Sequence, residues 1–146
     1  MTPVEAIRNV LNEQVSSCKV LLGILQRERV CLVELNAVGV EEISKEKDTV
    51  ILRMRLLEEE RIRLVKKCFQ RELTLKEIST VTGDATLLDI RSTLLSLAQS
   101  VEELNQFNKV LIDRSLSYVR SGAGFFGYHG FGQDSSVKGN LISAEI

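Results

Sequence analysis

The stretch TLLDIRSTLLSLAQSVEELNQFNKVLIDRSLSYVR, residues 86–120, decides the fold of this chain. Its apolar residues recur at steps of three and four, which is the spacing of one face of an α-helix. At 1.5 Å per residue, the pattern predicts a helix of about 36 residues and roughly 54 Å. The residues on this stripe are Leu87, Ile90, Leu94, Leu97, Val101, Leu104, Asn108, Leu111, Ser115 and Val119.

A helix of the same length is predicted at the N-terminal end. Thr2 can cap it, with Pro3 at the first helical position and Glu5 at the third. Its stripe continues until Gly39, which supplies a stop, so the helix is expected to cover about 36 residues. The residues on this stripe are Ile7, Leu11, Val15, Cys18, Leu22, Leu25, Leu32, Leu35 and Val38.

Between these two helices, the segment over residues 41–73 predicts another long helix, because a narrow apolar stripe runs through a highly charged sequence. The stripe consists of Ile43, Val50, Met54, Leu57, Leu64 and Cys68. Thr74 and Glu77 then form a second capping box, which opens a short helix through LKEISTV. Gly83, within TGDAT, interrupts this helix and predicts a hairpin corner.

Amphipathic helices of this length bury their stripes most simply against one another. The sequence therefore predicts an all-α fold, an elongated antiparallel bundle of three long helices plus a short helix. We expect residues 1–121 to form the bundle and residues 122–146 to form a flexible tail rich in glycine and aromatic residues. A dimeric coiled coil built from the same helices is the structural alternative.

Composition favours binding over catalysis. The 146 residues carry a net charge of −1, which gives no electrostatic basis for binding nucleic acid or an anionic membrane. The basic residues within 61–71 are flanked by glutamates, which indicates a solvated helix face. The three cysteines have neither metal-site nor disulfide spacing, and no leader or membrane span is evident. We therefore expect a cytoplasmic protein. Because His129 is the only histidine, we also expect that the protein is not an enzyme and uses no metal or cofactor.

The segment GAGFFGYHGFG, residues 122–132, contains G-x-G-x-x-G but lacks the context of a nucleotide site. A dinucleotide fingerprint needs a strand before it and a helix directly after it, whereas here a helix comes before it and more glycine follows. Burying the four aromatic rings would contribute about 6 to 12 kcal/mol. Ordering eleven backbone residues costs about 11 to 22 kcal/mol. The segment is therefore predicted to be loose and suited to folding on a protein partner.

Asn108 lies in the middle of the apolar stripe of residues 86–120. It is either a polar residue that fixes helix register in the core or an anchor for a bound chain. Phe107, Leu111 and Tyr118 lie with Leu104 on one flank and widen the apolar face. Either the chain's own second helix or tail covers this flank, or an amphipathic helix of a partner does.

Three stretches resemble the FlgN-type flagellar export chaperones, over roughly residues 5–119. They are RERVCLVELNAVGVEEISKEK, which contains Lys47; LRMRLLEEERIRLV, which contains Glu60 and Arg61; and ELNQFNKVLI, in which Asn108 matches an asparagine typical of the last family helix. The resemblance implies a cytoplasmic helical chaperone, a monomer or weak dimer. It would hold hook–filament junction proteins of the FlgK and FlgL type for type III export, with the export gate as a further candidate partner.

In that family the last helix and the tail would hold a C-terminal helical segment of the cargo. The candidate cargo-binding residues are therefore Leu104, Phe107, Asn108, Leu111, Tyr118 and Val119, to which the loose segment adds Phe125, Phe126 and Tyr128. The alternative function is a structural coiled-coil scaffold or adaptor that acts through self-association.

Overall fold

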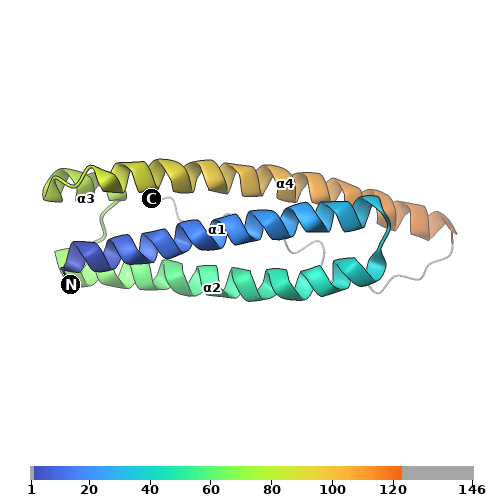
Figure 1. The fold of residues 1–146 in the computed structure, drawn as a ribbon, viewed down its shortest axis with the longest axis horizontal. Helices are drawn as coiled ribbons and strands as arrows, with labels where there is room; N and C mark the ends of the chain where they lie inside the picture. Colours follow the sequence, from blue (N-terminus) through green and yellow to red (C-terminus); the bar gives the residue numbers. More distant parts are fainter. Residues whose placement is uncertain (1, 123–146) are drawn as a thin grey trace.

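The computed structural model describes residues 2–122, and for residues 118–122 it describes the backbone alone. Four helices follow one another along this part of the chain: α1 (Pro3–Val33), α2 (Ala37–Phe69), α3 (Leu75–Thr82) and α4 (Thr86–Gly122). Three of them are long and lie side by side in an elongated bundle, while α3 caps one end (Figure 1). The predicted all-α bundle is confirmed. The predicted tail, residues 122–146, lies outside the described residues except for Gly122.

Helix α1 is the central element of the bundle. It runs antiparallel to α2 and parallel to α4, with one of them on each side (Figure 1). Among the described residues, no Cα atom of α2 lies within 8 Å of a Cα atom of α4. The two outer helices are therefore held together mainly through their shared contacts with α1.

The corner between α1 and α2 comes earlier than the sequence predicted. Helix α1 ends at Val33, and Leu35 adopts a left-handed backbone with φ of 54°. Gly39, the predicted stop, lies instead in the first turn of α2, where its N–H donates to Asn36 Oδ1 at 3.0 Å. A Cβ atom at Gly39 would lie 2.8 Å from Cys31 Sγ. Glycine is therefore needed here for close packing of the corner and not as a helix stop.

The buried stripe of α1 also differs from the predicted one. Alternating steps of four and three connect eight of its ten buried positions, namely Ile7, Leu11, Gln14, Cys18, Leu21, Leu25, Glu28 and Leu32. Val15 and Leu22 were predicted on the stripe but are only half-buried, and Leu21 takes the place predicted for Leu22. Gln14 and Glu28 were not predicted, because an apolar pattern passes over polar residues that are buried with partners. Leu35 and Val38 are exposed, since the chain has already turned.

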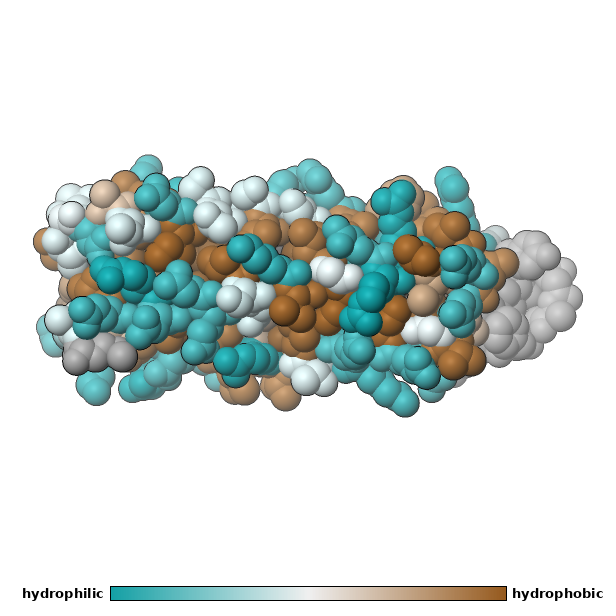
Figure 2. Space-filling model, in the orientation of Figure 1, coloured by the Kyte–Doolittle hydropathy of each residue, from teal (hydrophilic) through white to brown (hydrophobic). Residues whose placement is uncertain are grey.

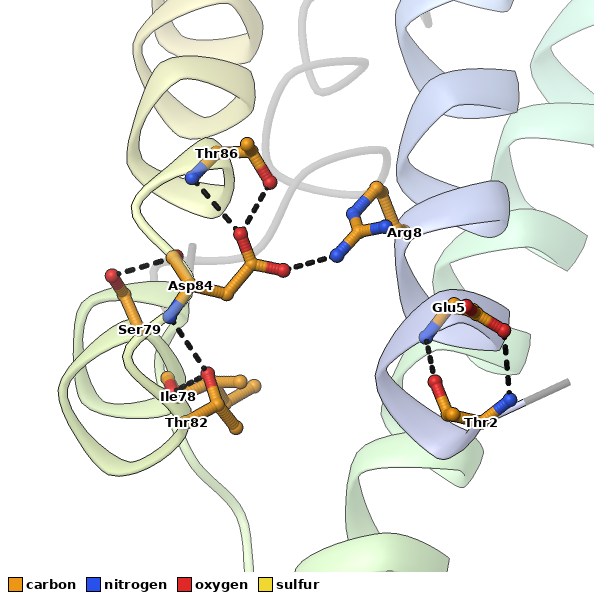
Figure 3. A network of polar contacts seen from close by, with 8 residues as sticks. All are labelled: Thr2, Glu5, Arg8, Ile78, Ser79, Thr82, Asp84 and Thr86. Atoms are coloured by element: carbon orange, nitrogen blue, oxygen red, sulfur yellow. Dashed lines mark hydrogen bonds and ion pairs between the residues drawn. The ribbon is translucent and has the colours of Figure 1, made fainter.

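Helix caps fix the end of the bundle at which the chain begins (Figure 3). Thr2 and Glu5 form the predicted capping box. Of the capping box predicted for α3, one half is described, in which Glu77 N–H donates to Thr74 Oγ1 at 3.2 Å. Helix α2 ends at Phe69, four residues before the predicted end, because Gln70 adopts a left-handed conformation. Gly83 ends α3 in the same conformation, as the sequence predicted.

Asp84 ties the start of α4 to α1. Its carboxylate accepts hydrogen bonds from Thr86 N–H, at 3.0 Å, and from the Arg8 guanidinium (Figure 3). The hydrogen bond from the Thr86 side chain, followed by that from Arg8, lowers the pKa of Asp84 below its usual range. This contact sets the register of the parallel pair α1 and α4 at one end.

The apolar core has two parts. A large cluster draws on all four helices, from Ile7 of α1 to Val101 of α4. A small cluster near the α1–α2 corner contains Leu32, Val40 and Ile112. On the face drawn in Figure 2, exposed hydrophobic residues form patches separated by hydrophilic ones. Among residues 2–122, no helix has both the length and the apolar character needed to cross a membrane.

Candidate binding surface at the end of helix α4

A buried polar cluster links the three long helices between the two apolar clusters. Asn108 of α4 is 1 % exposed, and its Nδ2 donates to Leu25 O and to Glu28 Oε1, both at 2.9 Å. The Lys47 ammonium of α2 donates to Glu28 Oε2 at 3.1 Å. The Glu28 carboxylate therefore receives donors from both outer helices, which compensates for its removal from water.

Asn108 thus faces inward. Its hydrogen bonds to Leu25 and Glu28 hold α4 against α1. This agrees with the prediction of a polar residue that fixes helix register in the core. Its Oδ1 is buried without a hydrogen-bond partner among the described residues. The amide is used for helix pairing, so any contribution of Asn108 to a binding surface acts through the position of α4.

Phe107, the neighbouring residue, points outward. Its side chain is 45 % exposed, and the Arg29 guanidinium lies over the ring, 4.5 Å from its centroid. Val110, one turn further along α4, is 49 % exposed. Phe107 was predicted at this surface, whereas Val110 and Arg29 were not, because periodicity does not identify which residue of α1 lies beside α4.

Leu104 and Leu111 are half-buried and support the base of this surface. Leu104 packs against the large apolar cluster and Leu111 against the small one. Tyr118 and Val119 belong to α4, but their side chains are not among those described. Phe125, Phe126 and Tyr128 lie outside the described residues. Of the predicted site, the structure therefore describes the side chains from 104 to 111. Phe107 is exposed, Leu104 and Leu111 are half-buried, and Asn108 is buried beneath them.

Helix α4 extends past the corner at which α1 ends (Figure 1). Asn108 lies opposite Glu28, and α1 ends five residues later, at Val33. Counting the same five residues along α4 leads to position 113, and Leu116 still packs against the small apolar cluster. The last six residues of α4, roughly 9 Å, therefore project beyond the body of the bundle. We call residues 117–122 the overhang.

A second buried polar cluster joins α1 and α2 closer to the other end. Arg61 is 1 % exposed and makes a two-point contact with Glu58, at 3.0 and 2.6 Å, and Glu58 also accepts from Gln14 Nε2 at 2.8 Å. Gln14 and Glu28 are separated by two heptads of the α1 stripe, a spacing that could have revealed both clusters. No group of residues suited to holding a metal ion occurs among the described residues.

Comparison with known proteins agrees with these observations. A family model described as FlgN protein matches residues 1–127, which include all four helices. No curated protein and no solved structure matches the chain. Because the matched region covers well over half of the 146 residues, the chain belongs to the FlgN family.

Proposed function

We propose that this protein is a cytoplasmic flagellar export chaperone that binds hook–filament junction proteins of the FlgK and FlgL type and keeps them soluble until export. Membership of the FlgN family supports the role in flagellar export. The observation that supports the binding site is the exposure of Phe107 and Val110 on the part of α4 that leads to the overhang. The reaction is one of association, in which no bond is made or broken.

The size of the surface determines how much of it the cargo must use. Fully burying a large apolar side chain contributes about 1.5 to 3 kcal/mol, so covering two half-exposed ones also contributes about 1.5 to 3 kcal/mol in total. Micromolar binding requires about 8 kcal/mol. Phe107 and Val110 therefore cannot hold a cargo helix by themselves. We infer that Tyr118 and Val119 of the overhang, together with Phe125, Phe126 and Tyr128 of the tail, supply the remaining contacts.

Calorimetric titration of the full chain with a purified junction protein tests the proposal. Phe107→Ser is expected to weaken binding by about fivefold, since it removes about 1 kcal/mol of burial. A second variant, which replaces Phe125, Phe126 and Tyr128 with serine, is expected to weaken binding more. Leu56→Ser on α2, where the side chain is 55 % exposed, is the matched control and should leave affinity unchanged. Equal affinities for all four chains would contradict the proposed site.

Self-association as a scaffold is the second candidate. An open groove of about 590 Å³ lies between α1 and α2, with Val20, Ile24 and Val50 among its lining residues. A Cβ atom at Gly23 would meet nothing within 4 Å, so the groove has room for a side chain from another helix. Sedimentation distinguishes the candidates, because a scaffold forms a stable oligomer that Val20→Glu dissociates, whereas a chaperone forms a one-to-one complex with its cargo.

A further inference from the structure

Helix α3 packs against the start of α4 at the opposite end of the molecule from the overhang (Figure 1). A pocket lies between these two helices and Arg71. It is open to solvent and has a volume of about 370 Å³. Its lining residues are Arg71, Lys76, Glu77, Thr80, Val81 and Leu88. None of them belongs to the buried core, and none is part of the cargo surface proposed above.

The wall of the pocket contains exposed apolar residues that are not needed for packing the core. Helix α3 already packs against the core through Leu75 and Ile78, which are fully buried, yet Val81 is 61 % exposed. Leu88 of α4 lines the pocket, and Leu95 lies two turns beyond it, outside the lining; each is 42 % exposed. They are seven residues apart, so they share one face of the helix and lie about 10 Å from each other. A second helix can pack on leucines that repeat one heptad position, with the polar residues Arg91 and Ser92 between them.

The rim of the pocket is basic. Arg71 and Lys76 form no ion pair with any residue that the structure describes, and Glu77 is the only acidic residue in the lining. The nearby Lys66 already pairs with Glu72, at 3.3 Å. This end therefore presents positive charge beside an apolar stripe, although the whole chain has a net charge of −1.

We propose that this surface docks an acidic amphipathic helix of another protein. Apolar residues of that helix, seven apart, would pack on Leu88 and Leu95, and carboxylates near its end would meet Arg71 and Lys76. Charge complementarity selects an acidic helix over a basic one, because like charges at the rim would repel it. About 12 residues of α4, roughly 18 Å, separate Leu95 from Phe107, so both surfaces can be occupied at once.

The probe is a synthetic helical peptide of about 18 residues, with leucines at heptad positions and glutamates at one end, titrated into the isotope-labelled full chain. Amide signals of residues 71–95 are expected to shift, while those of the overhang stay unchanged. Lys76→Glu and Leu88→Glu should each weaken binding by about fivefold, as expected for one ion pair or one half-exposed leucine. Lys45→Glu and Leu56→Glu, both exposed on α2, are the controls.

Four results would overturn the proposal. The first is equal binding of a peptide in which lysines replace the glutamates. The second is a set of peptide-induced shifts spread over the whole bundle. The third is a change in the signals of residues 123–146 when Leu88→Glu is introduced without peptide, because the chain's own tail would then be the occupant. The fourth is an oligomer of the full chain that Lys76→Glu dissociates, because a second copy would then be the occupant.

The test is independent of the proposed chaperone function. Lys76→Glu should bind a junction protein as tightly as the natural chain does, and Phe107→Ser should bind the acidic peptide unchanged. Failure of the peptide to bind would leave the cargo site intact. Loss of cargo binding in Lys76→Glu would show that the two surfaces are one, which contradicts the inference.

Discussion

At the scale of single residues, the buried charges determine how the long helices are matched. The Lys47 side chain is 3 % exposed and the Glu28 side chain 1 %. A buried pair of this kind adds little net stability compared with apolar residues, but removing one partner strands the other charge. The main effect of the Lys47–Glu28 pair is therefore on helix register. Any other alignment of α1 with α2 would bury Glu28 without a cation and would be less stable.

Lys47→Met is expected to destabilise the protein by about 3 to 5 kcal/mol, since it leaves Glu28 buried with only the Asn108 amide as a described donor. Glu28→Gln combined with Lys47→Met should recover part of this loss, because neither position then carries a buried charge. Urea unfolding followed by circular dichroism measures both variants. If the double variant is less stable than Lys47→Met alone, the stranded charge is not the cause.

The carboxylate of Asp84 makes stability depend on pH in the acid range. Its pKa is lowered in the folded state by hydrogen bonds from Thr86 and Arg8, so the unfolded chain binds its proton at a higher pH. The stabilising contribution is fully present above the unfolded pKa, near 3.8, and is lost as the pH falls through the folded value. Asp84→Asn should therefore lower the melting temperature at pH 7. Near pH 2, the melting temperatures of the variant and the natural chain should become equal.

At the scale of helices, two glycines that look alike in the sequence have opposite roles. Gly39 lies where a Cβ atom would come within 3 Å of both Asn36 Nδ2 and Cys31 Sγ, whereas a Cβ atom at Gly23 would meet nothing within 4 Å. The sequence analysis assigned a helix stop to Gly39, because glycine often ends a helix. Close approach of α1 to α2 is a tertiary property that a local pattern does not contain.

Gly39→Ala is expected to cost about 1 to 3 kcal/mol, as overpacking does in a tight site. Gly23→Ala should instead stabilise the protein by about 0.5 to 1 kcal/mol, because alanine is the better helix former and has room here. Thermal unfolding of the two variants under identical conditions provides the comparison. Stabilisation by both substitutions would contradict the close packing at the corner.

The number and order of the helices could be predicted from the sequence, since capping residues such as Thr2 and Thr74 and the three- and four-residue spacing are local signals. The buried face of α1 could only partly be predicted. Gln14 and Glu28 are buried because Glu58 and Lys47 come from another helix to meet them, and such pairing is invisible to a pattern of apolar residues. The same limit applies to Arg29 beside Phe107.

At the scale of the whole molecule, the two apolar clusters differ greatly in size. The large one includes residues from four helices, while the small one rests on Leu32, Val40 and Ile112. Fewer buried contacts lower the free energy of local opening. The end that carries the proposed cargo surface is therefore the less stable end of the bundle.

Hydrogen exchange should reveal this difference. Amides of α4 from 110 to 117 are expected to exchange at least about tenfold faster than those from 94 to 101, which corresponds to about 1.4 kcal/mol in opening free energy. Addition of a junction protein should slow exchange in the first group and leave the second unchanged. Uniform protection along α4 in the free chain would contradict the weaker end.

The central position of α1 has a consequence for which length changes the protein can tolerate. Deleting one residue from the middle of α1 would rotate all later side chains by about 100° and so disrupt the contacts with both neighbours together. The same deletion in α2 would disrupt one set of contacts and spare the other. Insertions and deletions among related sequences should therefore be less frequent in α1 than in α2 or α4, even though α4 carries the proposed cargo surface.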